Sequence, residues 1–403
     1  MKARVSATAA DSASTANPGT LIMRRLLCLL ALITVSLSPS AMAQSAFDTR
    51  ASHAVILDYE SGDVLFSKNG EEPMPPASMS KLMTALMVFE ALEDGRFTLD
   101  TSLPVSENAW RRGGAASGSS TMFLDVNSRA EVGDLIRGII VQSGNDACIV
   151  VAEALGGTEE NFAQMMTERA HELGFESASF ANATGWPDPD HRISALDLAR
   201  LARHIIETYP QYYDIYSETE FTYNGIRQYN RNPLLGVFDG ADGLKTGHTE
   251  ESGYGLVASA ERDGERRIVV FNGMDSNRAR ADESERLMRA AFSEFSTVDL
   301  VEAGEVLGDA EVYLGVAPRV ELRAAENLSF GLHRRDRDGV TAELVYQAPL
   351  HAPVQEGDIV GQLDVTLPDG REMSVPVEAA QSVARKGAMG RAGAALARLI
   401  RGG

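Results

Sequence analysis

The sequence predicts an α+β domain, in which helices flank an antiparallel sheet, followed by a small all-β sandwich domain. Hairpin-like segments stand at both ends of residues 44–296, and helical patterns fill the interval between them. After about Thr297 the composition changes, and short alternating strands follow one another up to Glu378. We therefore expect two folded domains, at 44–296 and 297–378.

The first domain is expected to begin with strands. Residues 54–67 contain two β-rich runs around a turn at 61–63, which predicts a hairpin. The prolines at 75–76 then end the extended structure. Residues 78–92 are rich in helix formers and apolar on nearly all sides, so we expect a buried helix there.

The rest of this domain is predicted to be helical, with a second hairpin near its end. Glycine, asparagine and proline separate helical patterns at 131–142, 144–155, 159–173 and 194–208. Residues 255–260 and 267–272 flank an Asp-Gly turn and predict the hairpin, and the last helix is expected at about 282–295. In the second domain the clearest strands are 312–316, 342–346 and 359–365.

Composition and motifs argue against nucleic acid as a partner and against a metal site. The 403 residues carry a formal net charge of −20, whereas nucleic-acid binding requires clustered Lys and Arg. None of the seven histidines lies in an HExxH motif, and no metal-ligand cluster appears, so we expect no metal and no cofactor. Cys28 falls in the predicted signal, which leaves Cys148 as a small buried hydrophobe without a disulfide partner.

Residues 1–43 are expected to be a leader and a signal peptide. The residues Met-Arg-Arg at 23–25 precede an apolar run at 26–37 and a small-x-small cleavage motif at 41–43. Cleavage would leave Gln44 as the mature N-terminus, and we expect translation to start at Met23. The pattern predicts an exported, periplasmic protein.

The tail, residues 379–403, contains five basic residues and no acidic ones. Its apolar residues would share one helical face, which predicts a basic amphipathic segment in a membrane interface. Glycines at 387, 390 and 393 oppose a helix by about 1 kcal/mol each, so a disordered basic tail is the alternative. We favour the anchor, which would make the protein peripheral on the outer face of the cytoplasmic membrane.

Three short strings predict an acyl-transfer site. In the first, Ser78-Met79-Ser80-Lys81, the lysine follows the serine at i+3 and therefore lies within reach of its hydroxyl. An ordinary lysine has a pKa of about 10.4. Burial, the helix N-terminus and a second cation such as Lys245 would lower that pKa, so that Lys81 could act as a base toward Ser78.

The other two strings supply polar groups to the same cleft. Ser143-Gly144-Asn145 stands at a junction between two helices, where Ser143 could relay a proton and Asn145 could hold Lys81. In Lys245-Thr246-Gly247, the first two residues would face a substrate carboxylate. Gly247 would let an extended substrate approach an edge strand closely.

These strings resemble those of the penicillin-binding D-alanyl-D-alanine carboxypeptidases, the low-molecular-mass serine peptidases of family S11 that trim peptidoglycan stem peptides. The resemblance extends over residues 76–84, 143–147, 180–187 and 245–249, and it covers nearly everything after the signal. It implies a β-lactamase/transpeptidase-like first domain. It also implies that peptidoglycan stem peptides are the substrate and β-lactams covalent inhibitors.

The resemblance further implies roles for individual residues. Ser78 would be acylated, with Lys81 as base, Ser143 as proton relay and Asn145 in support. The backbone N–H groups of Ser78 and His248 would form the oxyanion hole. Arg280 matches the carboxylate-binding arginine, although Arg278 is two residues away. The chain departs from the usual pattern at Thr167 and over 186–190, beside the cleft, which bears on substrate preference.

Three alternatives remain at this point. A D,D-endopeptidase of the same family would use the same site on a cross-linked peptide. A class A β-lactamase would share Ser78, Lys81 and the Lys-Thr-Gly string, but its ExxLN carboxylate pattern is absent, and SGN replaces SDN. A binding or scaffold protein that kept the fold and lost activity is disfavoured because all the proposed catalytic residues are present.

Overall fold

The computed structural model describes residues 2–7 and 47–390, so the predicted signal segment and the end of the basic tail lie outside the described residues. The chain divides into two compact units. The larger unit holds Asp48–Val298 and Ser329–Arg334. The smaller holds Asp299–Leu328, strand β1 and the described residues from Arg335 onward.

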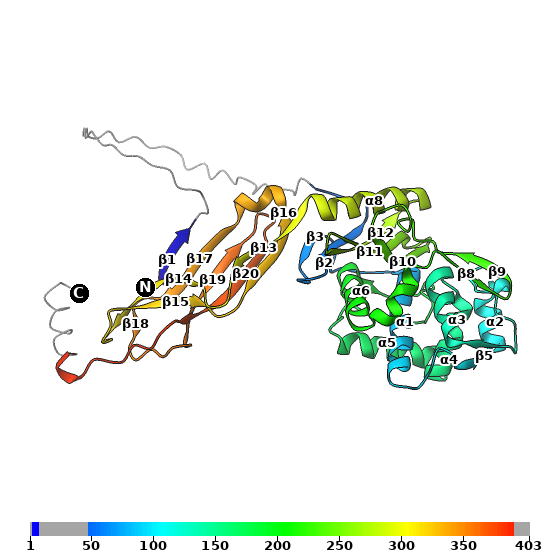
Figure 1. Ribbon diagram of the computed structural model, residues 1–403, viewed down its shortest axis with the longest axis horizontal. Coiled ribbons are helices and arrows are strands. Elements are labelled where there is room, and N and C mark those ends of the chain that lie inside the picture. Colours follow the sequence, from blue (N-terminus) through cyan, green and yellow to red (C-terminus); the bar gives the residue numbers. More distant parts are fainter. Residues whose placement is uncertain (1, 8–46, 391–403) are drawn as a thin grey trace, which may run out of the picture. The chain divides into compact units, whose positions relative to one another are not determined.

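The larger unit is built on a five-stranded antiparallel sheet with the strand order β10-β11-β12-β2-β3 (Figure 1). Both predicted hairpins are present in it, and β12 pairs with β2, which joins the two ends of the domain sequence. The strands are β2 (His53–Asp58), β3 (Val64–Lys68), β10 (Ala241–Thr249), β11 (Gly253–Arg262) and β12 (Glu265–Met274).

Helices cover both sides of this sheet, with α8 on one side and α6 among those on the other (Figure 1). The helices are η1 (Ala77–Ser80), α1 (Lys81–Glu93), α2 (Glu107–Gly113), η2 (Ala115–Ser117), α3 (Val132–Arg137), η3 (Gly138–Gln142), α4 (Asn145–Gly156), α5 (Glu159–Glu172), α6 (Ala195–Thr208), α7 (Pro210–Tyr213), η4 (Asp214–Ser217) and α8 (Asn277–Ser293). The unit also contains three short strand pairs: β4 (Pro73–Met74) with β7 (Ile193–Ser194), β5 (Ser102–Pro104) with β6 (Arg129–Glu131), and β8 (Glu220–Tyr223) with β9 (Ile226–Tyr229). The predicted α+β class is confirmed.

Several helix boundaries differ from the sequence expectation for local reasons. Helix α8 begins at Asn277 rather than near residue 282, because the Ser276 hydroxyl caps it by accepting the backbone N–H of Ala279 at 3.1 Å. The segment predicted as one helix at 131–142 is α3 followed by the π-helical turn η3. Helix α2 was not predicted, since its seven residues are too few to show a period.

The smaller unit is all-β, as predicted. Its seven strands form one hydrogen-bonded order, β1-β17-β19-β20-β15-β14-β18. They are β1 (Lys2–Ala7), β14 (Val306–Tyr313), β15 (Arg319–Ala324), β17 (Thr341–Gln347), β18 (Leu350–His351), β19 (Ile359–Thr366) and β20 (Glu372–Ala379). Strand β1 belongs to the predicted leader and pairs with β17, from Lys2 opposite Gln347 to Ala7 opposite Ala342.

Two boundaries between the parts of the chain are less simple than the sequence suggested. Strand β16 (Leu328–His333) pairs with β13 (Phe295–Val301), and most of β16 belongs to the larger unit. The segment expected as a tail from residue 379 is still paired with the β domain at Val383 and Lys386, whose N–H groups donate to Val354 and Leu314 carbonyls at 2.8 Å.

Within the described residues, no helix has both the length and the apolar composition needed to cross a membrane.

Candidate active site

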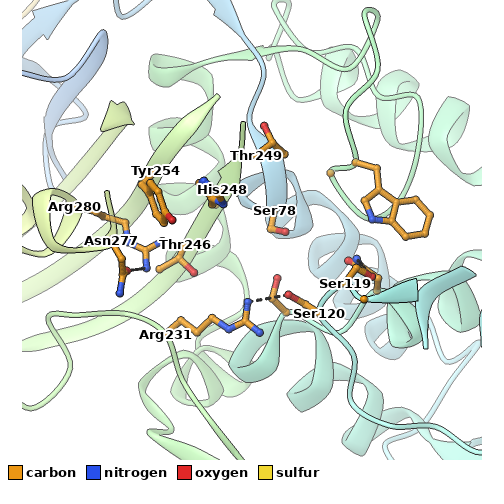
Figure 2. A pocket seen from close by; sticks show the side chains of 16 residues that line it. Ser78, Ser119, Ser120, Arg231, Thr246, His248, Thr249, Tyr254, Asn277 and Arg280 are labelled. Carbon is orange, nitrogen blue, oxygen red and sulfur yellow. Dashed lines mark hydrogen bonds between the residues drawn. The ribbon is translucent and has the colours of Figure 1, made fainter. Parts of the chain in front are cut away.

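A pocket of about 670 Å³ in the larger unit brings together residues from η1, α4, β10 and α8 (Figure 2). Its lining residues are Ser78, Gly118, Ser119, Ser120, Ser143, Asn145, Gly185, Trp186, Arg231, Thr246, Gly247, His248, Thr249, Tyr254, Asn277 and Arg280. Two guanidinium groups line this pocket and no carboxylate of the described residues does. The pocket therefore favours an anionic ligand.

Ser78 and Lys81 lie one turn apart at the junction of η1 and α1. The Lys81 Nζ lies 3.0 Å from Ser78 Oγ, 2.7 Å from Asn145 Oδ1 and 2.5 Å from the Thr184 carbonyl oxygen. The last two partners can only accept hydrogen bonds. A neutral amine that donates to both of them keeps its lone pair for the Ser78 hydroxyl, which is the arrangement that a base needs.

The surroundings of Lys81 raise the fraction of this neutral form above that of an ordinary lysine. The side chain is 1% exposed, and burial lowers the pKa of Lys81 to about 8, with a smaller contribution in the same direction from Arg231. Arg231 is thus a cation that the sequence analysis did not expect, and the expected cation, Lys245, also interacts with Lys81. Three groups oppose the shift in the Lys81 pKa: Cys148, Asp146 and Glu159.

The Ser-Gly-Asn string turns the chain between η3 and α4. Ser143 adopts the left-handed conformation (φ 63°, ψ 34°), which ends the π-helical turn, and Asn145 begins α4. The Asn145 amide accepts from Lys81 through Oδ1 and donates through Nδ2 to Ser119 Oγ at 3.0 Å. The Ser143 hydroxyl is buried and has no hydrogen-bond partner in the structure, so it is free to bond a ligand.

The Lys-Thr-Gly string lies on β10, the edge strand of the five-stranded sheet. Thr246, Gly247 and His248 line the pocket. A Cβ at Gly247 would lie 2.8 Å from the Pro76 carbonyl oxygen and 3.0 Å from Met79 Cγ. Gly247 therefore lets β10 approach the turn that carries Ser78, whereas the sequence had suggested a close approach of substrate.

Lys245 lies behind the pocket and is not among its lining residues. Its side chain is 3% exposed, and its Nζ donates to the Thr246 carbonyl oxygen at 3.1 Å. Burial first, and then the neighbouring Lys81, hold the pKa of Lys245 well below its ordinary value. The expected contact of Lys245 with a substrate carboxylate stays a prediction.

Arg280 forms one side of the pocket together with two aromatic rings (Figure 2). Its guanidinium lies 5.5 Å from the centroid of the Tyr254 ring, which in turn stacks on His248 with 3.7 Å between ring centroids. Asn277 accepts from Arg280 Nη2, and Arg280 Nε is buried without a partner. Burial lowers the pKa of Arg280 to about 10.

Sequence reasoning missed the second guanidinium group of the pocket and several polar residues of its lining. Arg231 follows strand β9, and its Nη1 donates to Ser120 Oγ at 2.8 Å (Figure 2). Ser119, Ser120 and Asn277 also line the pocket. None of these lies in a short motif with a chemical meaning of its own; only their placement by the fold identifies them.

A tight loop at residues 182–186 supplies the carbonyl that holds Lys81. The Asn182 Oδ1 accepts from Thr184, Gly185 and Trp186 backbone N–H groups at 2.8–3.1 Å, and its Nδ2 donates to the Trp186 carbonyl. Thr167 of α5, one of the noted departures, binds the chain just before this loop, since its hydroxyl accepts the Phe180 N–H at 2.9 Å.

Comparison with known proteins gives a consistent result. The family model of D-alanyl-D-alanine carboxypeptidase matches residues 40–276, and that of the penicillin-binding protein 5 C-terminal domain matches residues 295–385. The D-alanyl-D-alanine carboxypeptidase DacA of Haemophilus influenzae is 36% identical over 325 residues, which are 79% of this chain and 81% of that protein.

Two solved structures are similar to the whole chain or to its larger unit. The D-alanyl-D-alanine carboxypeptidase DacD from Francisella tularensis has a TM-score of 0.74 at 31% identity, covering 84% of this chain and 95% of that one. Penicillin-binding protein D2 from Listeria monocytogenes, solved in an ampicillin-bound form, has a TM-score of 0.54 at 29% identity, covering 62% of this chain and all (100%) of that one.

Proposed function

The chain belongs to the D-alanyl-D-alanine carboxypeptidase family, and on this premise we propose that it removes the terminal D-alanine from peptidoglycan pentapeptide stems through an acyl-enzyme on Ser78. The observation that carries the proposal is the set of three contacts of Lys81 Nζ, at 2.5–3.0 Å. A neutral amine that donates to Asn145 and Thr184 keeps its lone pair for the Ser78 hydroxyl. The reaction is an acyl transfer to serine and then to water.

In the first step, Ser78 Oγ attacks the carbonyl carbon of the penultimate D-alanine, and its proton passes to Lys81 Nζ. The backbone N–H groups of Ser78 and His248 would stabilise the negative charge on the carbonyl oxygen. When the C–N bond breaks, the departing amine takes up a proton, for which the unpartnered Ser143 hydroxyl is the proposed relay. Water then releases the shortened stem and restores Ser78.

The terminal carboxylate of the substrate requires a cationic partner. Arg231 and Arg280 both line the pocket, and Thr246 stands beside them on β10 (Figure 2). We assign carboxylate binding to this basic side of the pocket, with Arg280 as the predicted partner and Arg231 as a second one. A guanidinium group suits a carboxylate because it can donate two parallel hydrogen bonds.

The pocket lining argues against a class A β-lactamase as the alternative. Fast deacylation in such an enzyme needs a carboxylate near the nucleophile to activate water. The described pocket residues include no Asp or Glu. A penicillin should therefore acylate Ser78 and remain bound as a slowly hydrolysed ester.

Labelled penicillin tests the proposal directly. We expect a covalent adduct that maps to the peptide containing Ser78, and release of free D-alanine from a pentapeptide. The variant Ser78→Ala should form no adduct, while Ser80→Ala, two residues further along the chain and outside the pocket lining, should still form one. Folded protein without an adduct would refute the acyl-enzyme, and cleavage of a cross-linked dimer in place of the pentapeptide would favour the endopeptidase.

The place of action is a further part of the proposal. We propose that the enzyme is exported and works on the outer face of the cytoplasmic membrane, with its basic tail in the membrane interface. The support is the signal pattern at 23–43 and the five bases after residue 378.

A further inference from the structure

A charge pair stands behind the wall of the pocket. Arg112 lies on α2 and Glu159 is the first residue of α5. Arg112 Nη1 and Glu159 Oε2 are 2.8 Å apart, and the carboxylate side chain is only 5% exposed, whereas the arginine is 42% exposed. A buried carboxylate needs such a partner, because burial raises the pKa of Glu159 and Arg112 opposes that rise.

The second oxygen of Glu159 faces the loop that holds Lys81. Glu159 Oε1 accepts the Ala183 N–H at 3.4 Å. The Ala183 carbonyl oxygen accepts from Thr84 Oγ1 at 2.8 Å. The next carbonyl, that of Thr184, accepts from Lys81. Three backbone groups of residues 183–184 are thus bound by Glu159, Thr84 and Lys81.

Arg112 reaches the same loop at its other end. Its guanidinium lies 5.2 Å from the centroid of the Trp186 ring, and Trp186 lines the pocket. A cation over an aromatic face is attracted by the ring quadrupole and favours one ring orientation. The pair therefore contacts both ends of the segment 183–186, with the base at one end and a pocket wall at the other.

We propose that Arg112 and Glu159 are positioning residues of the active site, which act as a pair to hold segment 183–186 against Lys81 and to orient Trp186. The inference rests on the proposed acyl-enzyme at Ser78. If one partner is removed, the other is left as an uncompensated charge beside the loop. Removal of both leaves no such charge.

The pair also bears on the protonation of Lys81. The charged groups that act on Lys81 are Arg231, Asp146, Glu159 and, through its own interaction with Lys81, Lys245, together with the Cys148 thiol. Those that act on Glu159 are Arg112 and Glu160. Because the negative charge of Glu159 favours the ammonium form of Lys81, its removal should make the neutral base available at lower pH.

The test compares acylation by a fluorescent penicillin, as a second-order rate constant across pH, in four forms of the full chain: wild type, Arg112→Gln, Glu159→Gln and the double variant. Arg112→Gln should slow acylation about tenfold, because it strands the buried carboxylate. The double variant should recover most of that loss. Glu159→Gln should move the acid limb of the profile to lower pH, and Arg112→Lys should retain most of the activity.

The neighbouring pair on the same helix provides a matched control. Arg111 Nη1 and Glu107 Oε1 are 3.8 Å apart with both side chains largely exposed, so Arg111→Gln and Glu107→Gln should leave the rate and the limb unchanged. The inference would be overturned if both single variants of the buried pair kept the wild-type acylation rate and the wild-type acid limb of the pH profile. It would also be overturned if the rate losses of the two single variants simply added in the double variant. If the wild type itself is not acylated on Ser78, the proposed function fails instead.

Discussion

Lys81 lies where an ammonium ion is poorly solvated, and its three polar contacts are arranged for an amine. The fold disfavours the ammonium form of Lys81 because it places this residue at the start of the buried helix α1, where no carboxylate of the described residues accepts a hydrogen bond from it. The cost of keeping the side chain neutral at neutral pH falls accordingly, since each unit of lowered pKa saves about 1.4 kcal/mol.

The pH dependence of acylation should report this environment. Because the folded-state pKa of Lys81 is lowered to about 8, the neutral fraction grows as pH rises through that value. The second-order rate constant of acylation should therefore climb from pH 6 to pH 9 and level off above it. Lys81→Gln should reduce the plateau about 10²- to 10⁴-fold. A flat profile, or a rise only near pH 10.5, would show that Lys81 is not the base.

At the scale of elements, Asp146 joins the start of α4 to the loop that carries Ser119 and Ser120. Its carboxylate accepts from Thr121 Oγ1 and the Met122 N–H at 2.6 and 2.9 Å, and also from the N–H groups of Leu124 and Ala147. All of these partners are donors. The loop and the helix therefore share one buried acceptor, close to the Ser-Gly-Asn string.

The substitution Asp146→Asn should disturb this junction, because an amide places N–H groups against other donors. We expect a loss of about 1–3 kcal/mol in the free energy of unfolding, measured by urea denaturation, together with slower acylation. Asp282→Asn on α8, where the carboxylate is exposed and 3.8 Å from Arg278, should change stability by less than about 0.5 kcal/mol. Equal stability of the two variants would contradict this role for Asp146.

The elements that the sequence predicted well are those with long periodic patterns or clear turns. The hairpins of β2–β3 and β11–β12 and the helices α4, α5 and α6 are examples. The hairpin of β8 and β9 was missed because its short strands expose polar and apolar residues alike. Arg231, directly after this hairpin, was missed with it, since only the fold brings it to Ser120.

At the scale of the whole molecule, the described chain after β20 pairs with the β domain, and the proposed membrane anchor would begin only after this paired segment. Residues 380–386 are paired with the β domain, whereas the composition alone suggested a tail that begins at residue 379. Amphipathic character and basic charge describe a segment that can bind a membrane. These two properties do not reveal which residues of the segment form backbone hydrogen bonds with the β domain.

Two truncations should separate the pairing of residues 380–386 with the β domain from the proposed membrane anchoring. A chain that ends at Lys386 should keep full penicillin acylation and stability but should no longer sediment with membranes, because it lacks the proposed anchor. A chain that ends at Ala380 should in addition unfold at lower temperature in calorimetry, since Val354 and Leu314 lose their hydrogen-bond partners. Membrane sedimentation of the chain that ends at Lys386 would refute the anchor.

The close contact of Gly247 with Pro76 and Met79 has a consequence for inhibitors. Backbone and side-chain atoms fill the space behind β10 at this point, so a compound that is held at Ser78 cannot grow in that direction. Additional affinity must come from groups that extend sideways, over Trp186 or toward the stacked rings of His248 and Tyr254. Selectivity between related enzymes should be sought in those side chains rather than beneath the nucleophile.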